Sequence, residues 1–259
     1  MQTVRLVFLL SGIVALLPGA SISLSISAPG EQATFVGSAL TETFNSPALG
    51  IRTTSFNAAI GVYQLNTNSA LAILAANQYG GANGSNYVSL GAQSGTSTPV
   101  SLQLNASYNY FGFWWSAGDR NNGLSLYDGD QFLARISTAD ITNRLSPTTG
   151  QVQAVNGSFY NNSLFYGNPN DLTQNTGEPY AYVSLIATGV TFNRIVFDNS
   201  GTTGTGFESD NHSVYFGSIS VPGTSVLISN TPTAVPEPAT FALCGAALLA
   251  LGYTRRRRA

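Results

Sequence analysis

A series of short segments rich in aromatic and β-branched residues constrains the fold of this chain more than any other feature. Each segment is bounded by Gly, Asn or Asp, which is typical of β-strands separated by turns. In SLQLNA and LSLYDG, polar and apolar residues alternate, as expected of strands with one buried face. The predicted strands are Tyr87 to Leu90, Val100 to Asn105, Tyr108 to Trp115, Leu124 to Tyr127, Phe132 to Ile136, Tyr180 to Ile186, Phe192 to Phe197 and Val214 to Ile219.

The sequence also predicts one tight hairpin and one short helix. Asp128-Gly129 lies between LSLY and QFLARI, and this dipeptide favours a two-residue turn because Gly adopts positive φ readily. Ala139 to Leu145 has the only helical pattern, with Ser137 or Thr138 as its N-cap. Many short strands without alternating helices favour an all-β, antiparallel two-sheet sandwich, and we expect its topology to be a jelly roll.

Charge and cysteine content exclude several classes of partner and of stabilising bond. Charged residues make up 8% of the 259 residues, and none is a lysine, whereas about 25% is usual in soluble proteins. Between residues 29 and 235, 11 acidic residues stand against five arginines, which argues against nucleic acid or an anionic membrane as partner. The single cysteine, Cys244, lies in the C-terminal apolar run, so the preceding domain must be stable without disulfides.

The N-terminal segment has the plan of a secretory signal peptide. Arg5 precedes an apolar run from Leu6 to Leu17, and small residues follow. The run is too short for a stable membrane span. We therefore expect a signal peptide over residues 1–28, with cleavage between 20 and 28, followed by one extracellular β-sandwich domain over residues 29–230.

The C-terminal segment, residues 231–259, has three parts in a fixed order. A proline-flanked acid comes first, an apolar stretch over residues 239–253 follows, and an arginine cluster ends the chain. As a helix, the apolar stretch is about 22 Å long, which is marginal for a bilayer core of about 30 Å, and the arginines favour a cytoplasmic C-terminus. This pattern predicts transient insertion in the inner membrane. Its motif residues are Pro236, Glu237, Pro238, Arg255, Arg256, Arg257 and Arg258.

These three parts together resemble the PEP-CTERM sorting signal of Gram-negative bacteria, which exosortase recognises. The resemblance implies exosortase as a processing partner, removal of the tail, and release or attachment of the body at the cell surface or in the extracellular matrix. A permanent membrane anchor is the alternative.

A second resemblance involves the body of the chain. The stretch Tyr108 to Ile136, which contains FGFWWSAGD, is similar to a group of exosortase-dependent surface proteins, together with FYGNPN, GEPYAYVSL and GFESDNHSVYF. This resemblance implies a location and a β fold, and it implies no reaction. The segments also resemble jelly-roll carbohydrate-binding modules at the level of fold.

Few residues are available for catalysis. His212 is the only histidine, the nucleophile motif GxSxG is missing, and zinc would lack its usual ligands. Glycoside hydrolysis needs only two carboxylates, and Glu208 and Asp210 would share one face of a strand. They resemble the E-x-D pattern of laminarinase-type sandwiches, but the third carboxylate of that pattern is replaced by His212 or Ser213. We therefore expect the protein not to be an enzyme.

Two candidate binding sites remain. Resemblance to jelly-roll modules suggests a structural Ca²⁺ at Asp210, with Asn45 on the N-terminal side, and an ordinary loop carboxylate is the alternative. Trp114 and Trp115 point to opposite faces of a regular strand, so Trp114 is the ring predicted to be reachable and Trp115 the one predicted to enter the core. Burial of both rings is the alternative. The glycan platform would comprise Trp114, Tyr108, Tyr110, Asp119 and Asn121.

The sequence thus predicts an exported, exosortase-processed, non-catalytic protein with a structural or adhesive role at the cell surface or in the matrix. A carbohydrate-binding module for exopolysaccharide is the first alternative. A glycoside hydrolase is the second.

Overall fold

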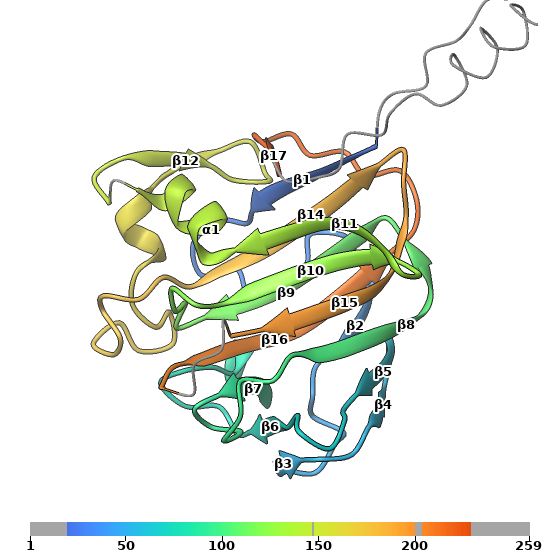
Figure 1. Ribbon diagram of the computed structural model, residues 1–259. Helices are drawn as coiled ribbons and strands as arrows, with labels where there is room; N and C mark the ends of the chain where they lie inside the picture. Colours follow the sequence, from blue (N-terminus) through green and yellow to red (C-terminus); the bar gives the residue numbers. More distant parts are fainter. Residues whose placement is uncertain (1–19, 147, 200–203, 229–259) are drawn as a thin grey trace, which may run out of the picture.

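Two antiparallel sheets packed face to face form the body of the protein (Figure 1). The computed structural model describes residues 20–146, 148–199 and 204–228. Strands make up 48% of the structure and helices 7%, which confirms the prediction of an all-β antiparallel fold. The jelly-roll topology stays a prediction.

The larger sheet, called sheet A, has nine strands. Along the sheet these are β17 (Val226–Leu227), β1 (Ser21–Ile26), β14 (Ala181–Thr188), β9 (Tyr110–Ser116), β16 (Gly206–Tyr215), β7 (Tyr87–Gly91), β6 (Leu71–Leu74) and β3 (Gly50–Arg52), while β2 (Leu40–Glu42) pairs with the second half of β16. Strands β1 and β17 therefore lie at one edge, and β3 lies at the other.

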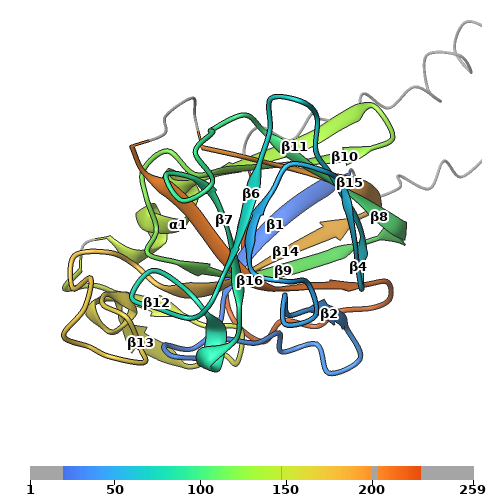
Figure 2. The same ribbon diagram turned by 90° about the horizontal axis from the view of Figure 1, so that it is seen from below.

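The smaller sheet, sheet B, has six strands in the order β11 (Gln131–Ser137), β10 (Gly123–Asp128), β15 (Phe192–Asp198), β8 (Val100–Tyr108), β5 (Gly61–Gln64) and β4 (Phe56–Ala58). Its last strand, β4, lies at the same end of the sandwich as β3, and Figure 2 views the molecule from this end. The remaining elements are helix α1 (Thr138–Leu145), the pair β12 (Gln151–Gln153) and β13 (Phe159–Asn161), and two short 3-10 helices, Ala82–Gly84 and Asn162–Phe165.

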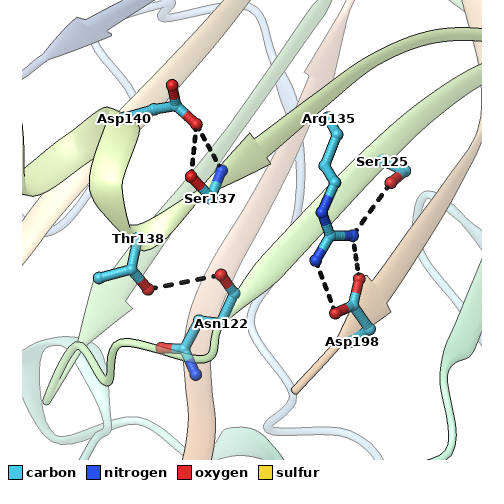
Figure 3. Close-up of polar contacts among 7 residues, drawn as sticks. All are labelled: Asn122, Ser125, Arg135, Ser137, Thr138, Asp140 and Asp198. Carbon is cyan, nitrogen blue, oxygen red and sulfur yellow. Dashed lines mark hydrogen bonds and ion pairs between the residues drawn. The ribbon is translucent and has the colours of Figure 1, made fainter. Parts of the chain in front are cut away.

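Local sequence signals explain the hairpin and the helix. Strands β10 and β11 pair through the predicted turn, where Gly129 has φ +57°. Ser137 is the N-cap of α1, and the Asp140 carboxylate accepts hydrogen bonds from the Ser137 backbone nitrogen and hydroxyl, both at 2.7 Å (Figure 3). This reciprocal cap satisfies donors at the start of a helix that would otherwise be unpaired.

The structure corrects two of the predicted strands. Tyr108 to Trp115 is not one strand, because β8 ends at Tyr108 in sheet B and β9 begins at Tyr110 in sheet A. The last predicted strand, Val214 to Ile219, is also wrong. The strand there is β16, which begins at Gly206 and ends at Tyr215.

Apolar side chains from both sheets form one core between them. The largest fully buried side chains of this core are all aromatic. They are Trp115, Tyr63, Phe44, Phe111, Phe113, Phe165 and Phe192. A second, smaller cluster on the opposite face of sheet A comprises Ala82, Trp114, Ala117, Tyr180 and Tyr182. Loops therefore cover the outer face of sheet A where β9 crosses it.

Strand β1 shows that the sandwich begins earlier than the expected boundary at residue 29. Its six residues pair with β14 from Ser21↔Thr188 to Ile26↔Val183, and Ile22, Leu24 and Ile26 are fully buried. Residues 1–19 of the expected signal peptide and the whole expected sorting helix lie outside the described residues. Within residues 20–146, 148–199 and 204–228, no helix has the length and apolarity needed to cross a bilayer.

We expect the exported protein to begin at or before Ser21, because a later cleavage would remove β1 from the core. Burial of three aliphatic side chains contributes roughly 5 to 9 kcal/mol, at about 1.5 to 3 kcal/mol each, which is comparable to the whole stability of a typical domain. N-terminal sequencing and intact mass of the exported protein measure the cleavage site.

Two recombinant bodies provide the control, one beginning at Ser21 and one at Pro29. The first should unfold cooperatively in urea, and the second should lack a folded baseline. A folded, exported protein whose first residue lies between 23 and 29 would contradict the role given to β1.

Candidate functional site

The polar residues of β16 are the most chemically distinctive group in the body. Glu208, Asp210 and His212 lie along this strand, which is buried at every position except its last. Sheet A continues on both sides of β16, with β9 on one side and β7 followed by β2 on the other. The sequence reasoning treated Glu208 and Asp210 as residues of one strand, but the strand range that it predicted in this region, Val214 to Ile219, begins after all three residues.

A β-bulge in β16 decides where these side chains point. Asp210 pairs with Trp114 and Ser213 pairs with Gly112, so two residues of β16 oppose the single residue Phe113 of β9. Asn211 has φ +47°, a left-handed conformation that Asn tolerates better than most residues. Because of the extra residue, Asp210 stays on the outer face of sheet A while His212 turns into the core.

The His212 imidazole lies among the aromatic rings of the core. It stacks on Phe197, with ring centroids 5.1 Å apart and planes inclined by 11°, and it meets Phe44 edge-on at 5.0 Å. Nδ1 lies 2.6 Å from the Tyr63 hydroxyl, and Nε2 lies 2.9 Å from the Ser209 hydroxyl. Burial lowers the pKa of His212 to about 3, so the imidazole is neutral at physiological pH.

The Asp210 carboxylate is fully buried beneath the loop 81–86. It accepts hydrogen bonds from the backbone nitrogen of Ala82 at 2.8 Å, from the Ser85 hydroxyl at 2.5 Å, and from the backbone nitrogen of Asn211 at 2.6 Å. Burial raises the pKa of Asp210 to about 7, although these three donors oppose the increase. Asp210 therefore attaches the loop to the outer face of sheet A.

Glu208 is buried two positions earlier on the same face. Its Oε1 accepts a hydrogen bond from the Ser89 hydroxyl on β7 at 3.0 Å, and a side chain at Gly206 would collide with this oxygen. Burial raises the pKa of Glu208 to about 8. Glu208 and Asp210 do share a face, as predicted, but neither carboxyl reaches the surface.

The two residues of the expected calcium site do not share a contact. The Asn45 side-chain oxygen accepts from the backbone nitrogen of Asn86 at 3.0 Å, while Asp210 is surrounded by the donors described above. Calcium needs six to eight oxygen ligands. The described residues contain no group of three or more His, Cys, Asp or Glu side chains placed to hold a metal. Calcium at Asp210 stays a prediction, and the observed contacts favour a hydrogen-bonding role.

The structure contradicts the predicted glycan platform. Trp114 is only 2% exposed and packs against Tyr180, with ring centroids 6.2 Å apart, and Tyr110 is fully buried with its hydroxyl 2.8 Å from that of Thr34. Tyr108 belongs to the other sheet. The prediction assumed that one face of β9 is open to solvent, but loops cover that face. Trp115 enters the core, as predicted.

Asn122 explains the arrangement of the segment FGFWWSAGDRNNG, which includes the other two platform residues. Its Oδ1 accepts from the indole nitrogen of Trp115 at 2.9 Å and from the backbone nitrogen of Asp119 at 3.1 Å, and its Nδ2 donates to the Gly206 carbonyl at 2.7 Å. Figure 3 shows Asn122 beside Thr138 at the start of α1. Asp119 and Asn121 therefore flank a structural turn and do not converge with Trp114.

Sequence reasoning missed the residues of a cleft at the edge of the sandwich where β3 and β4 lie. This cleft has a volume of about 510 Å³. It is lined by Glu42, Ser46, Pro47, Arg52, Phe56, Asn57, Ala58 and Ala59. The strands that contribute to it are three residues long, so no periodic pattern could identify them, and its charged members lie ten positions apart in the sequence.

Residues 234–258 match the family described as the PEP-CTERM protein-sorting motif. The chain carries a PEP-CTERM motif. This motif implies export through the membrane to the cell surface or extracellular space and processing by exosortase. The match lies outside the sandwich, so the resemblance of FGFWWSAGD to a specific group of PEP-CTERM proteins stays a prediction. No curated protein and no solved structure matches the chain significantly.

The raised pKa values predict how the stability of the body depends on pH. The pKa of Glu208 rises from an ordinary 4.5 to about 8, and that of Asp210 from 3.8 to about 7, so the folded state holds these protons more tightly. Their contribution is complete below about pH 4 and is lost as the pH rises to about 8. His212 acts in the opposite direction, because its contribution is present above pH 6.5 and lost towards pH 3.

We therefore expect the free energy of unfolding to fall between pH 5 and pH 8. In Glu208→Gln this fall should be smaller than in the wild type, by on the order of 2 kcal/mol. Urea unfolding at several pH values measures this difference. The matched control is Glu31→Gln at an exposed position, which should keep the wild-type profile. A Glu208→Gln profile parallel to that of the wild type would contradict the burial of this carboxyl group.

Proposed function

We propose that the exported body is a non-catalytic β-sandwich with a structural or adhesive role at the cell surface or in the extracellular matrix. One observation carries the proposal. The histidine and the acidic pair that could serve catalysis, His212, Glu208 and Asp210, are at most 2% exposed and hold the sheet and its loops together.

In this account, the E-x-D pattern of Glu208 and Asp210 is a structural feature of sheet A. A glycosidase needs two carboxyl groups that flank the scissile bond of a bound sugar. A sugar could reach Asp210 only if the loop 81–86 left the sheet, and that movement would break the hydrogen bonds from Ala82 and Ser85. This is why we favour a structural or adhesive role over hydrolysis.

The pairing of the first and last strands of the described body supports display from a membrane. The backbone nitrogen of Ile228 donates to the carbonyl of Ile22 at 2.9 Å, and β17 pairs with β1. The first and the last described strands of the sandwich therefore lie side by side. The edge with β3 and β4 lies at the opposite end of the sandwich from β1 and β17 (Figure 1).

The proposal is tested with protein recovered from the surface of an exosortase-bearing host. Its intact mass should show loss of the residues after about Pro238, and incubation with matrix polysaccharide should release no reducing ends above a protein-free control. Retention of Arg255 to Arg258 would contradict processing at the motif. Polysaccharide cleavage that Glu208→Gln abolishes would contradict a non-catalytic role.

A further inference from the structure

We propose that the cleft between β3 and β4 binds a neutral saccharide, a site that deepens the proposed adhesive function and rests on it. The cleft volume of about 510 Å³ lies within the range of pockets that hold small molecules, roughly 300 to 1,000 Å³. The cleft combines a carboxylate, a guanidinium group, an amide and an aromatic ring, and these groups suit a ligand with hydroxyls and an apolar face.

Glu42 is fixed at the base of this cleft. Its Oε1 accepts from the backbone nitrogen of Phe44 and its Oε2 from that of Ala59, both at 2.7 Å. Because a carboxylate offers about four acceptor sites, each oxygen keeps capacity for a ligand hydroxyl. The bond to Ala59 also joins β2 of sheet A to the turn between β4 and β5 of sheet B, so the carboxylate is held in one orientation.

Arg52 provides donors that the protein leaves largely unused. Its Nη2 donates to the Ala48 carbonyl at 2.6 Å, and among the described residues no carboxylate forms an ion pair with it. Its Nε is buried without a partner, so the donors that a ligand can reach are those of the terminal Nη atoms. A guanidinium group has five N–H donors. The half-buried Arg52 can therefore donate to a ligand without giving up an existing ion pair.

Phe56 supplies the apolar surface of the cleft. Its half-buried ring stacks on that of Tyr63, with centroids 5.0 Å apart and planes inclined by 14°. Tyr63 is in turn fixed by its hydroxyl, which lies 2.6 Å from Nδ1 of His212. The Phe56 ring is thus held against the core, and a rigid aromatic ring loses little entropy when a sugar packs on it.

Charge selects a neutral ligand over an acidic one. Glu42 and Arg52 give the cleft one charge of each sign, while residues 29–235 have 11 acidic residues against five arginines and repel polyanions. A second cleft of about 490 Å³ near Asn109 and Phe216 has no charged side chain. The Asn109 amide is already used there, because its Nδ2 donates to the Gly217 carbonyl and its Oδ1 accepts from the Gly217 backbone nitrogen. The first cleft therefore offers the better-equipped site.

Calorimetric titration with a panel of neutral hexasaccharides, based on glucose, mannose and galactose, tests the site on the wild-type body. We expect at least one to bind, and we expect Arg52→Ala and Ala59→Trp to weaken that binding at least tenfold. The second variant fills the cleft from an exposed position and leaves every charge in place. Arg120→Ala, at an exposed arginine in the turn between β9 and β10, is the matched control and should bind as the wild type does.

The site is overturned if no neutral hexasaccharide binds, if both cleft variants bind as well as the wild type, or if only an acidic oligogalacturonate binds. Thermal melting of each variant shows whether it is folded. If Arg52→Ala is unfolded, the binding affinity of Ala59→Trp tests the site. Release of reducing ends during the titration would instead contradict the non-catalytic function, so the two failures are distinguishable.

Discussion

The rest of the sandwich depends on the bulge at Asn211, where β16 inserts one extra residue opposite β9. It turns His212 into the aromatic core and leaves Asp210 facing outwards. The same strand therefore packs in the core through His212 and binds the loop 81–86 through Asp210. It also lies where the neighbour of β16 changes from β7 to β2. Because the only cysteine is Cys244, outside the described residues, the body relies on packing and hydrogen bonds of this kind.

Local sequence patterns predicted most of the long strands, the Asp128-Gly129 hairpin and helix α1, because each depends on neighbours in the sequence. The same logic failed at Trp114. Alternation correctly placed Trp115 in the core, but no local pattern shows that loops cover the opposite face of sheet A. Strand β1, SISLSI, falls within the expected signal peptide because a stretch of small residues typically follows the apolar run of such a peptide. Glu42 and Arg52 were missed because the cleft forms only when short strands of different sheets meet.

The two edges of the sandwich differ in structure. At one edge, β17 pairs with β1, so the first and last strands of the described body lie side by side. At the other edge, β3 and β4 flank the polar cleft that we assign to a saccharide. Between them, the groups with catalytic potential are used to stabilise the fold.

An NMR titration of the imidazole nitrogens tests most directly whether the bulge buries His212, and the chain has a single histidine, so the signal needs no separate assignment. Burial lowers the pKa of His212 to about 3, so the ring should stay neutral from pH 8 down to at least pH 5. Its nitrogens should also show one fixed tautomer, set by Tyr63 and Ser209. Titration of the imidazole near pH 6.5 in the folded protein would show that His212 is exposed and would contradict this account of the fold and of its buried polar strand.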